Sequence, residues 1–584
     1  MTGLSLFLVF VLAKAFSLWG HVAHVTLWSS IAWFWQDALA AVAYAAIGQV
    51  TRGSWKYPWR AFYWLLVAWA AINIPVARAV FTPLTPPMLR AAGGPLADSI
   101  RLYITPANVA LMFTVILSAF LLPQLLQRLP STAPKWAAVS AVAMIAAGPT
   151  ASARANTHGM DRNVLFAVAV RNSVPNATDL STLAGGRMLP YPATATEDLR
   201  PFSASARGFN VVMVGLESTA ARYLNLFDPA ANRDHADAMP NLTALARNGL
   251  VFENAYAVYP ESIKGLFSVL CSMYPAFNTE PAQYTGSGCQ PIASALAKAG
   301  YRTALFHSGR FDYLGMESII HQSGYGTLED AGDIGGNHES SFGVDEPATV
   351  TRILSWIDTL PAGQRFFLTY LPIAGHHPYA TPSAGPFAVR DEIDQYRNAL
   401  YYGDVSLGAL VKGLRDRGLS RNTLWIVYGD HGEAFHQHEG NYGHTFFLYE
   451  ENVHVPLIVA APGIIEVRHP IEKVVSLVDV GPTILDLAGL PSPANYQGRT
   501  VLDPAPRRAY FFTDYSLGLL GLRDGPWKFI SETGSSRAEL YDLKSDPGET
   551  VNLAIRRSGR VTEYDHLARR WSAAQRAAIL RAGR

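Results

Sequence analysis

Hydrophobic residues are concentrated in the first 150 residues of the chain, where charged side chains almost vanish. Five apolar stretches occur there, each close to the ~20 residues that a helix needs to cross a bilayer. They are Leu4–Ala23, Thr26–Val50, Trp59–Phe81, Pro106–Leu126 and Trp136–Ala153. The pattern predicts an α-helical membrane domain of five transmembrane helices over residues 1–153. A signal peptide is a poorer interpretation of the first stretch, because four more follow and no small-residue cleavage site stands out.

Basic residues in two connecting segments predict the orientation of these helices. Arg52, Lys56 and Arg60 lie around the junction of the second and third stretches. Arg128 and Lys135 lie between the fourth and fifth, and neither segment contains an acidic residue. By the positive-inside rule both segments are cytoplasmic. The N-terminus is then inside, and an odd number of spans places the rest of the chain outside the cytoplasm.

Three charged residues lie within or at the edge of the apolar stretches. Charges inside a membrane usually pair, extend to the interface or mark function. For Lys14 and Arg78 we expect side chains that extend to the membrane interface. Asp37 lies deeper and needs a partner, which the sequence does not identify. A transporter is disfavoured, because five spans without an internal repeat precede a large exported region.

After a connector over residues 154–208, rich in Ala, Thr and Pro, apolar runs alternate with helical patterns. The strand-like runs are Asn210–Leu216, Tyr301–His307, Arg365–Ile373, Leu424–Tyr428 and Pro456–Ala461. Between them Asp394–Arg417 has the pattern of a long amphipathic helix. Strands that alternate with helices predict an α/β domain over residues 209–584, with a mostly parallel central sheet covered on both faces.

Composition narrows the function classes. The formal net charge is +1, so no basic excess indicates a nucleic-acid partner. The hydrophobic fraction of 49% is high for a soluble enzyme. The two cysteines, Cys271 and Cys289, both lie in the exported part, where a disulfide is permitted. The loop between them is short enough to close, and we favour a bridge over a pair of buried free thiols.

Three predicted strands end in candidate metal ligands or polar anchors. Glu217 follows the first strand, His376 follows a later one, and Asp430 and His431 come directly after Leu424–Tyr428. Ligands of open α/β sheets bind outside the carboxyl ends of the strands. A carboxylate beside an imidazole there suits a divalent metal ion. For Asp430 and His431 taken alone, a surface turn is an equally good interpretation.

Ser262 lies at the start of a helical pattern that includes Leu266–Met273. The commonest role for serine at this position is that of an N-cap. A helix N-terminus also stabilises an oxyanion, and metal coordination can activate a hydroxyl group. Position alone leaves both interpretations open.

The sequence resembles the sulfatase-like branch of the alkaline phosphatase superfamily. The resemblance is strongest to the membrane-anchored lipoteichoic acid synthase-type phosphoglycerol transferases, and more distant to the phosphoethanolamine transferases. It covers roughly residues 209–554 and is carried by VVMVGLES, PESIKGLFSVLCSMYP, GHHPY, YGDHGE, GHTFFLYEENVHVPLIV, SLVDVGPTILDLAGLP and ELYDLKSDPGETVNLA. It implies a single divalent metal ion, Mn²⁺, Zn²⁺ or Mg²⁺, held by Glu217, Ser262, Asp430 and His431.

The resemblance also implies roles for further residues. Ser262 matches the family's nucleophile by its distance from the Tyr-Pro pair that ends the following helix. His376 matches a position that contacts the substrate phosphate or a second metal, and His444 corresponds to a substrate clamp or general acid. Lys264 and Arg310 would add positive charge for an anionic substrate, although a solvated surface charge is the simpler interpretation of each. Glu433 is expected to support the metal-binding histidine two residues before it.

Two departures separate the sequence from true sulfatases. The run Ser262–Leu266 lacks the Pro and Arg of the C/S-x-P-S-R motif in which sulfatases form formylglycine. Glu217 is a single acid where sulfatases carry two adjacent Asp ligands. Both differences favour phosphotransfer, although the transferases usually carry Thr rather than Ser as nucleophile.

We therefore predict a metal-dependent transferase in a bacterial-type inner membrane, multi-pass, with its sulfatase-like domain on the periplasmic side. It would move a phospholipid-derived headgroup, phosphoglycerol or phosphoethanolamine, to an envelope glycan or lipid acceptor through a phospho-Ser262 intermediate. The alternative is a hydrolase of sulfate or phosphate esters with the same fold. A catalytically silent, membrane-anchored binding protein is disfavoured, because the complete candidate ligand set is present.

Overall fold

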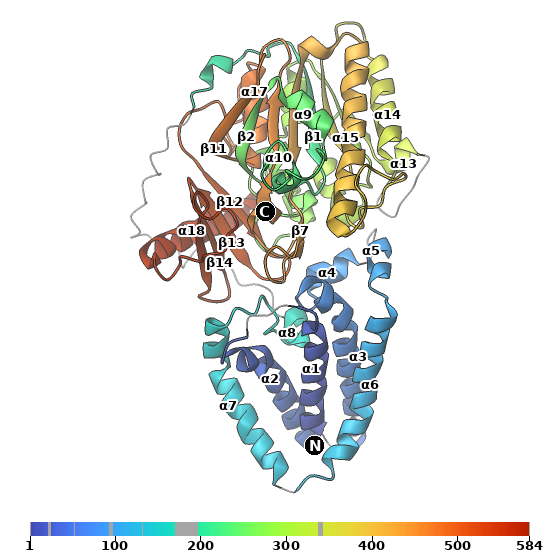
Figure 1. The fold of residues 1–584 in the computed structure, drawn as a ribbon, viewed down its shortest axis with the longest axis vertical. Helices are drawn as coiled ribbons and strands as arrows, with labels where there is room; N and C mark the ends of the chain where they lie inside the picture. The colour runs from blue at the N-terminus through green and yellow to red at the C-terminus, as the bar shows by residue number, and fades with distance from the viewer. Residues whose placement is uncertain are drawn as a thin grey trace.

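The computed structural model describes residues 2–21, 25–51, 53–92, 97–130, 132–169, 197–336 and 343–582. Much of the predicted connector, residues 170–196, lies outside the described residues. The N-terminal helices gather at one end of the molecule and the α/β part at the other (Figure 1). Between them lie three short helices: α4 (Pro86–Ala91), α5 (Ala97–Leu102) and α8 (Val164–Ala169).

Five longer helices form the N-terminal helical region: α1 (Thr2–Leu18), α2 (Ser29–Val50), α3 (Lys56–Val80), α6 (Pro106–Leu126) and α7 (Ala133–Arg154). By length and apolar composition, four segments of the described chain could cross a membrane: Ser29–Val50, Gly53–Val80, Pro106–Leu126 and Lys135–Arg154. The first helix ends at Leu18, short of the predicted Ala23. Its 17 residues extend about 26 Å at ~1.5 Å per residue, less than the ~30 Å hydrocarbon core. The expected spans are thus supported for four of the five helices.

The two charges deepest in the helical region form a buried ion pair. Lys14 Nζ lies 2.6 Å from Asp37 Oδ2, and their side chains are 5% and 2% exposed. Asn163 Nδ2 donates a hydrogen bond to Asp37 Oδ1 at 2.6 Å. The prediction that Lys14 extends to the interface is therefore wrong: it is the partner that Asp37 needs, since an unpaired buried charge is far more costly. Arg78 donates to Asn108 Oδ1 at 2.7 Å.

The α/β part is built on a nine-stranded sheet with the order β11-β2-β10-β6-β1-β5-β3-β4, in which β9 also pairs with β2. Its strands are β1 (Asn210–Leu216), β2 (Gly249–Tyr256), β3 (Arg302–His307), β4 (Thr327–Glu329), β5 (Phe366–Leu371), β6 (Thr423–Gly429), β9 (His454–Val455), β10 (Leu457–Ala460) and β11 (His469–Ser476). The central strand β1 pairs in parallel with β5 and β6. Only β9 and β10 pair antiparallel within the described sheet, so the mostly parallel sheet is confirmed.

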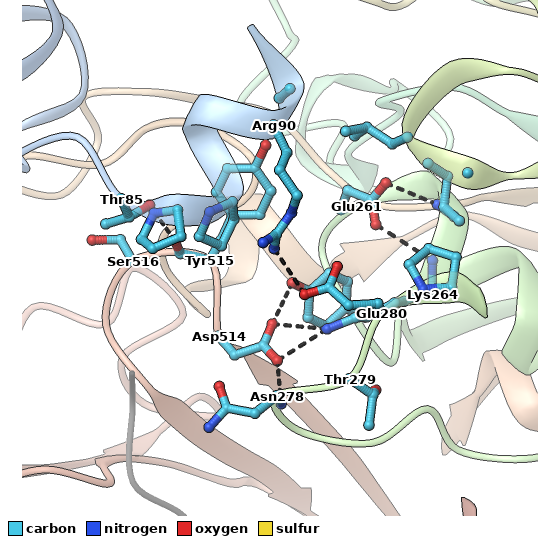
Figure 2. Close-up of a pocket in the computed structure, with 18 of the residues that line it drawn as sticks. Thr85, Arg90, Glu261, Lys264, Asn278, Thr279, Glu280, Asp514, Tyr515 and Ser516 are labelled. Atoms are coloured by element: carbon cyan, nitrogen blue, oxygen red, sulfur yellow. Dashed lines mark hydrogen bonds and ion pairs between the residues drawn. The ribbon is translucent and has the colours of Figure 1, made fainter. Parts of the chain in front are cut away.

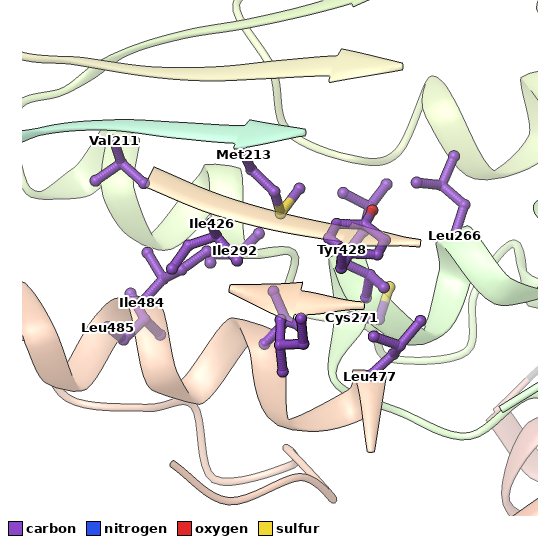
Figure 3. Close-up of a cluster of buried hydrophobic side chains, with 14 of the residues drawn as sticks. Val211, Met213, Leu266, Cys271, Ile292, Ile426, Tyr428, Leu477, Ile484 and Leu485 are labelled. Carbon is purple, nitrogen blue, oxygen red and sulfur yellow. The ribbon is translucent and has the colours of Figure 1, made fainter. Parts of the chain in front are cut away.

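Helices cover both faces of this sheet. One face carries α10 (Ser262–Cys271), α11 (Ile292–Lys298) and α17 (Val480–Leu487), and the other carries α9 (Pro240–Ala246), α14 (Glu346–Asp358) and α15 (Glu392–Asp416). Val211 and Met213 of β1 pack into the first core (Figure 3), and Val212 and Val214 into the second. Because successive strand residues point to opposite faces, a strand covered on both sides must be apolar throughout.

A second, four-stranded antiparallel sheet follows, which the sequence analysis did not predict. It contains β12 (Arg508–Thr513), β13 (Leu519–Asp524), β14 (Trp527–Glu532) and β15 (Ala538–Asp542), with α18 (Ser558–Ala582) packed against it. Short elements in the loops are α12 (Glu317–Ile320), α13 (Ala331–Ile334), α16 (Glu450–Val453) and the β7 (Ala434–Phe435) and β8 (Tyr442–Gly443) pair. The predicted disulfide between Cys271 and Cys289 is present.

The helical region contacts the end of the sheet at which the parallel strands finish. The Tyr103 hydroxyl donates to that of Tyr442 in β8, which follows β6, at 3.2 Å. His377, which follows β5, contacts the Ser99 hydroxyl of α5 through Nδ1 at 2.9 Å. The carboxyl ends of the central strands therefore face the N-terminal helices.

Candidate metal and nucleophile site

Two neighbouring strands bring the predicted carboxylates together. Leu216 at the end of β1 lies opposite Gly429 at the end of β6 in parallel register. The next residues, Glu217 and Asp430, therefore emerge side by side beyond the sheet, where ligands of α/β proteins bind. The Ser218 backbone N–H donates to Asp430 Oδ1 at 2.9 Å, which fixes the orientation of that carboxylate.

Ser262 is the first residue of α10, but it is not the cap of that helix. Glu261 precedes it and accepts hydrogen bonds from the backbone N–H groups of Ile263 at 3.1 Å and Lys264 at 3.4 Å. The N-cap interpretation of Ser262 is therefore wrong. Its hydroxyl instead donates to Glu217 Oε2 at 3.0 Å and lies 3.2 Å from His431 Nε2.

The donor atoms of the predicted ligand set converge. His431 Nε2 lies 3.5 Å from Glu217 Oε1, 3.4 Å from Asp430 Oδ2 and 3.2 Å from Ser262 Oγ. A tetrahedral ion about 2.1 Å from each ligand would hold its ligand atoms about 3.4 Å apart. His431 Nδ1 lies 3.0 Å from the Gly432 carbonyl, which assigns the proton to Nδ1 and leaves Nε2 as the metal-facing atom. Three oxygens and one imidazole thus fit a divalent cation.

The electrostatics of this cluster also favour a cation. Burial, with the nearby Glu217 carboxylate, raises the pKa of Asp430 to about 7. Burial alone would raise the pKa of Glu217 too, but its hydrogen bond to His431 and the charge of that ring lower it. Although burial acts against it, the two carboxylates raise the pKa of His431 to about 10. Adjacent buried carboxylates need a positive charge between them. A bound divalent ion would supply this charge in place of the proton on His431 Nε2, the ring atom that faces both carboxylates.

His444 lies beside the cluster and is held by a buried carboxylate. Its ring stacks on that of His431 with centroids 4.1 Å apart, and its Nδ1 contacts Glu433 Oε2 at 2.8 Å. The Tyr379 hydroxyl donates to Glu433 Oε1, also at 2.8 Å. Glu433 therefore holds His444, and not His431 as the sequence had led us to expect. The His376 ring meets that of His444 edge-on at 6.2 Å, so the structure brings all three predicted histidines together.

The two predicted basic residues lie in different surroundings. Lys264 is 7% exposed, and its Nζ forms an ion pair with Asp514 Oδ1 at 2.9 Å. The simpler interpretation of Lys264 as a solvated surface charge is therefore wrong. Burial lowers the pKa of Lys264, but the charge of Asp514 outweighs it and the pKa is raised. Arg310 follows β3 and is not among the residues that line the small cavity beside Ser262.

The structure adds residues that the sequence analysis missed. His307, the last residue of β3, lines a cavity of about 30 Å³ together with Glu217 and Ser262. Its Nδ1 contacts the Leu371 carbonyl at 3.0 Å. His307 ends a strand that the sequence did predict, so the strand-end rule that found Glu217 would also have found it. The capping role of Glu261 could not be predicted from the sequence, because serine is a preferred N-cap residue and Ser262 is its neighbour.

Two further groups of candidate metal ligands occur among the described residues. One, made of His431, Glu433 and His444, shares His431 with the site already described. The other consists of His438, Glu451 and Glu549. There Lys528 Nζ lies 2.9 Å from Glu549 Oε1 and already supplies a positive charge. Of these groups, the Glu217 group is therefore the one that combines candidate metal ligands with the candidate nucleophile Ser262.

Comparison with known proteins agrees with this geometry. Residues 209–490 match the family model described as Sulfatase, and residues 439–570 match that of the N-sulphoglucosamine sulphohydrolase C-terminal region. Arylsulfatase K of Bos taurus is 26% identical over 409 residues, which cover 54% of this chain and 74% of that protein. Arylsulfatase K of Gallus gallus is 32% identical over 222 residues, which cover 34% of this chain and 41% of that protein.

Solved structures show the same fold at low sequence identity. A protein of the alkaline phosphatase superfamily from Vibrio parahaemolyticus has a TM-score of 0.55 and 19% identity, covering 70% of this chain and 98% of that one. The lipoteichoic acid synthase LtaP from Listeria monocytogenes has a TM-score of 0.50 and 17% identity, covering 69% and 98%. Residues 209–490 are thus similar to the sulfatase family, and the solved structures share the fold of this part of the chain. The comparisons do not single out the transferase branch, and the curated relatives carry the name of sulfatases.

Proposed function

We propose that this protein is a membrane-associated, metal-dependent hydrolase of sulfate or phosphate esters with Ser262 as its nucleophile. The observation that carries the proposal is the position of the Ser262 hydroxyl, within 3.2 Å of both Glu217 and His431, at the start of a helix that Glu261 caps. Relatives named arylsulfatase K favour hydrolysis over the transfer that we predicted from the sequence.

The side chains have complementary roles in this reaction. Glu217, Asp430 and His431 would hold one divalent cation, which when bound lowers the pKa of the Ser262 hydroxyl and stabilises negative charge on the ester. Ser262 Oγ gives its proton to the Glu217 carboxylate that accepts its hydrogen bond and attacks the sulfur or phosphorus atom, and the bond to the leaving-group oxygen breaks. His444 Nε2, turned away from Glu433, gives that oxygen a proton. His376 is placed to contact the oxyanion beside it.

A water molecule completes the cycle. It attacks the sulfur or phosphorus atom now bound to Ser262 Oγ and returns a proton to His444. The bond to Oγ then breaks and Oγ takes its proton back from Glu217, which releases the acid and regenerates the serine. Hydrolysis thus differs from transfer only in the second acceptor, water instead of an alcohol.

Transfer of a phospholipid headgroup to an envelope acceptor is the second candidate. It is favoured by residues 262–266, which lack the Pro and Arg of the formylglycine motif, and by the contacts of Tyr103 and Ser99 with the end of the sheet at which the site lies. Four candidate spans and the basic segments between them support a multi-pass membrane protein with its catalytic domain outside the cytoplasm. A lipid-borne donor or acceptor would then meet the site at the membrane surface.

The test is turnover by the full chain in detergent, with 4-nitrophenyl sulfate and bis(4-nitrophenyl) phosphate, in the presence of Mn²⁺ or Zn²⁺. We expect Ser262→Ala to lower kcat by at least a thousandfold and Ser262→Thr to retain activity. Ser268→Ala is the matched control: it lies on the same helix, and its hydroxyl donates only to the Gly265 carbonyl, at 2.6 Å. We expect it to keep wild-type turnover.

Covalent labelling separates the two candidates. Intact mass after incubation with envelope phospholipid would reveal a phospho-headgroup on Ser262 if transfer is the reaction. Steady release of sulfate or phosphate without such an adduct supports hydrolysis. Full turnover by Ser262→Ala would refute both.

A further inference from the structure

Asp514 holds the chain on both sides of the candidate nucleophile. Its Oδ1 accepts hydrogen bonds from the Tyr259 hydroxyl at 2.7 Å and from Lys264 Nζ at 2.9 Å. Its Oδ2 accepts one from the Asn278 backbone N–H at 2.6 Å (Figure 2). Tyr259 lies shortly before Ser262 in the chain, and Lys264 lies shortly after it. A shift of the Asp514 carboxylate would therefore move both flanks of Ser262.

These contacts are shielded from water. Asp514 is 9% exposed, Lys264 7% and Tyr259 2%, and Lys264 Nζ lies 4.6 Å from the centre of the Tyr259 ring. In such surroundings an ion pair that separates leaves two uncompensated charges, which is strongly unfavourable. Asp514 and the first turn of α10 therefore move as one unit, and the position of Asp514 sets that of Ser262.

The N-terminal helical region holds the loop that carries Asp514. We call residues 514–516, which directly follow β12, the Asp514 loop. Thr85, directly before α4, donates from its hydroxyl to the Tyr515 carbonyl at 2.8 Å (Figure 2). Arg162, between α7 and α8, donates through Nη1 to the Ser516 carbonyl at 2.9 Å. One threonine and one arginine of the helical region thus fix the backbone of the Asp514 loop.

The buried charges of the helical region hold Arg162 in turn. Lys14 Nζ, which pairs with Asp37, also donates to the Arg162 carbonyl at 3.4 Å. The next residue, Asn163, donates to Asp37 Oδ1 at 2.6 Å. Ionisable residues inside a membrane domain are costly and commonly functional. Here the Lys14–Asp37 pair fixes the segment from which the Arg162 side chain reaches the catalytic domain.

We propose that Arg162 is a positioning residue for Ser262. Arg162 fixes the Asp514 loop, and the Asp514 carboxylate fixes the first turn of α10. Ser262 is thereby held 3.0 Å from Glu217, whose own position is set by β1. Because the two residues lie on different elements, their contact depends on a fixed α10, and a displacement of about 1 Å can cost on the order of a hundredfold in rate. The inference rests on the proposed function of Ser262 as nucleophile.

A second arginine joins the same two parts of the protein and provides the matched control. Arg537, between β14 and β15, donates through Nη1 to the Thr157 hydroxyl at 3.1 Å and to the Ala155 carbonyl at 3.3 Å. Its Nη2 pairs with Glu532 at 2.6 Å. Among the described residues it makes no hydrogen bond to the Asp514 loop. Loss of Arg537 therefore weakens the contact between the two parts without releasing that loop.

The experiment measures kcat, KM and Tm of the full chain in detergent, with the nitrophenyl ester that wild type hydrolyses faster. We expect Arg162→Gln to lower kcat about tenfold and to change KM less than about threefold, because the ester still binds but Ser262 is misplaced. Arg162→Lys, which can still donate to the Ser516 carbonyl, should recover part of this loss. Arg537→Gln should keep wild-type kcat, and the Tm of each variant separates misplacement from partial unfolding.

Equal losses of kcat in Arg162→Gln and Arg537→Gln would overturn the inference, because any weakening of the contact would then suffice. Wild-type kcat in Arg162→Gln would overturn it too. If Arg162→Gln fails to fold, Thr85→Val releases the Tyr515 carbonyl of the same loop and should lower kcat severalfold at constant KM; an unchanged kcat again overturns the inference. Inactive Ser262→Ala beside a fully active Arg162→Gln refutes this inference alone. Full turnover by Ser262→Ala, or wild type that cleaves neither nitrophenyl ester, refutes the proposed function as well.

Discussion

Replacing Glu433 by Gln isolates the contribution of one buried charge to the proposed reaction. Glu433 is 1% exposed and accepts hydrogen bonds from His444 Nδ1 and the Tyr379 hydroxyl, both at 2.8 Å. Gln keeps the volume of the side chain. Its carbonyl can accept from His444, and its amide can donate to the Tyr379 oxygen once that hydroxyl rotates. The substitution therefore removes the charge and leaves both contacts in place.

The magnitude follows from the difference between charged and neutral hydrogen bonds. A hydrogen bond to a charged group contributes about 1.5–3 kcal/mol and a neutral one about 0.5–1.5 kcal/mol. The Glu433 carboxylate holds His444 Nδ1 and thereby fixes the ring whose Nε2 faces the leaving group. Its loss should cost about 1–2 kcal/mol in the transition state, which lowers kcat roughly 5- to 30-fold. Tyr379→Phe removes one neutral partner and should cost less than fivefold.

A double-mutant cycle with His444→Gln tests whether Glu433 acts through His444. Steady-state turnover of the ester that wild type prefers is measured for wild type, both single variants and the double variant. In the His444→Gln background, we expect Glu433→Gln to change kcat by less than twofold. If Glu433→Gln costs the same factor in both backgrounds, its effect does not pass through His444, and the assigned role of the pair is wrong.

Three further predictions concern stability and metal dependence. Replacing Cys271 and Cys289 by Ala opens a loop with a sequence separation of 18, which should cost about 3 kcal/mol and lower Tm by several degrees; an unchanged Tm would contradict it. EDTA should abolish turnover and lower the Tm of wild type but leave the Tm of Asp430→Asn unchanged, since metal saturating a site at ~100 Kd adds about 2.7 kcal/mol. Burial lowers the pKa of His377 to about 4, whereas histidine in an unfolded chain has a pKa of ~6.5. Between pH ~4 and pH ~6.5 the unfolded state therefore binds more protons than the folded state. The free energy of unfolding should therefore fall by up to about 3 kcal/mol as pH drops from ~6.5 to ~4, and His377→Gln should flatten this slope in urea titrations.

Periodicity predicted most of the catalytic fold because each signal was local. The apolar runs of β1 and β6 are long enough to be recognised as buried strands, and their ends placed Glu217 and Asp430 correctly. The parallel register of β1 and β6 then brings Glu217 and Asp430 together, since two adjacent strands that end at the same level present their next residues side by side. The C-terminal sheet escaped prediction because its strands alternate with short turns and carry many charged residues, such as Arg523 and Lys528.

Side-chain partners far apart in the chain could not be predicted in the same way. Lys14 and Asp37 each look like isolated intramembrane charges, and only packing of α1 against α2 shows that they neutralise each other. Lys264 looked like a surface charge because its partner, Asp514, lies 250 positions away. The length of α1 was overestimated because the apolar run continues past the point at which the helix ends.

The cap at Glu261 separates the folding of α10 from the chemistry of its first residue. The backbone N–H groups of Ile263 and Lys264 are satisfied by Glu261, the residue before Ser262, so the helix does not depend on which side chain stands at position 262. Serine, threonine or cysteine could be exchanged there with little effect on the stability of the domain. A scaffold of this kind lets the reacting atom vary while the surrounding ligands and the fold stay the same, which gives evolution, and protein engineers, a position where reactivity can be changed on its own.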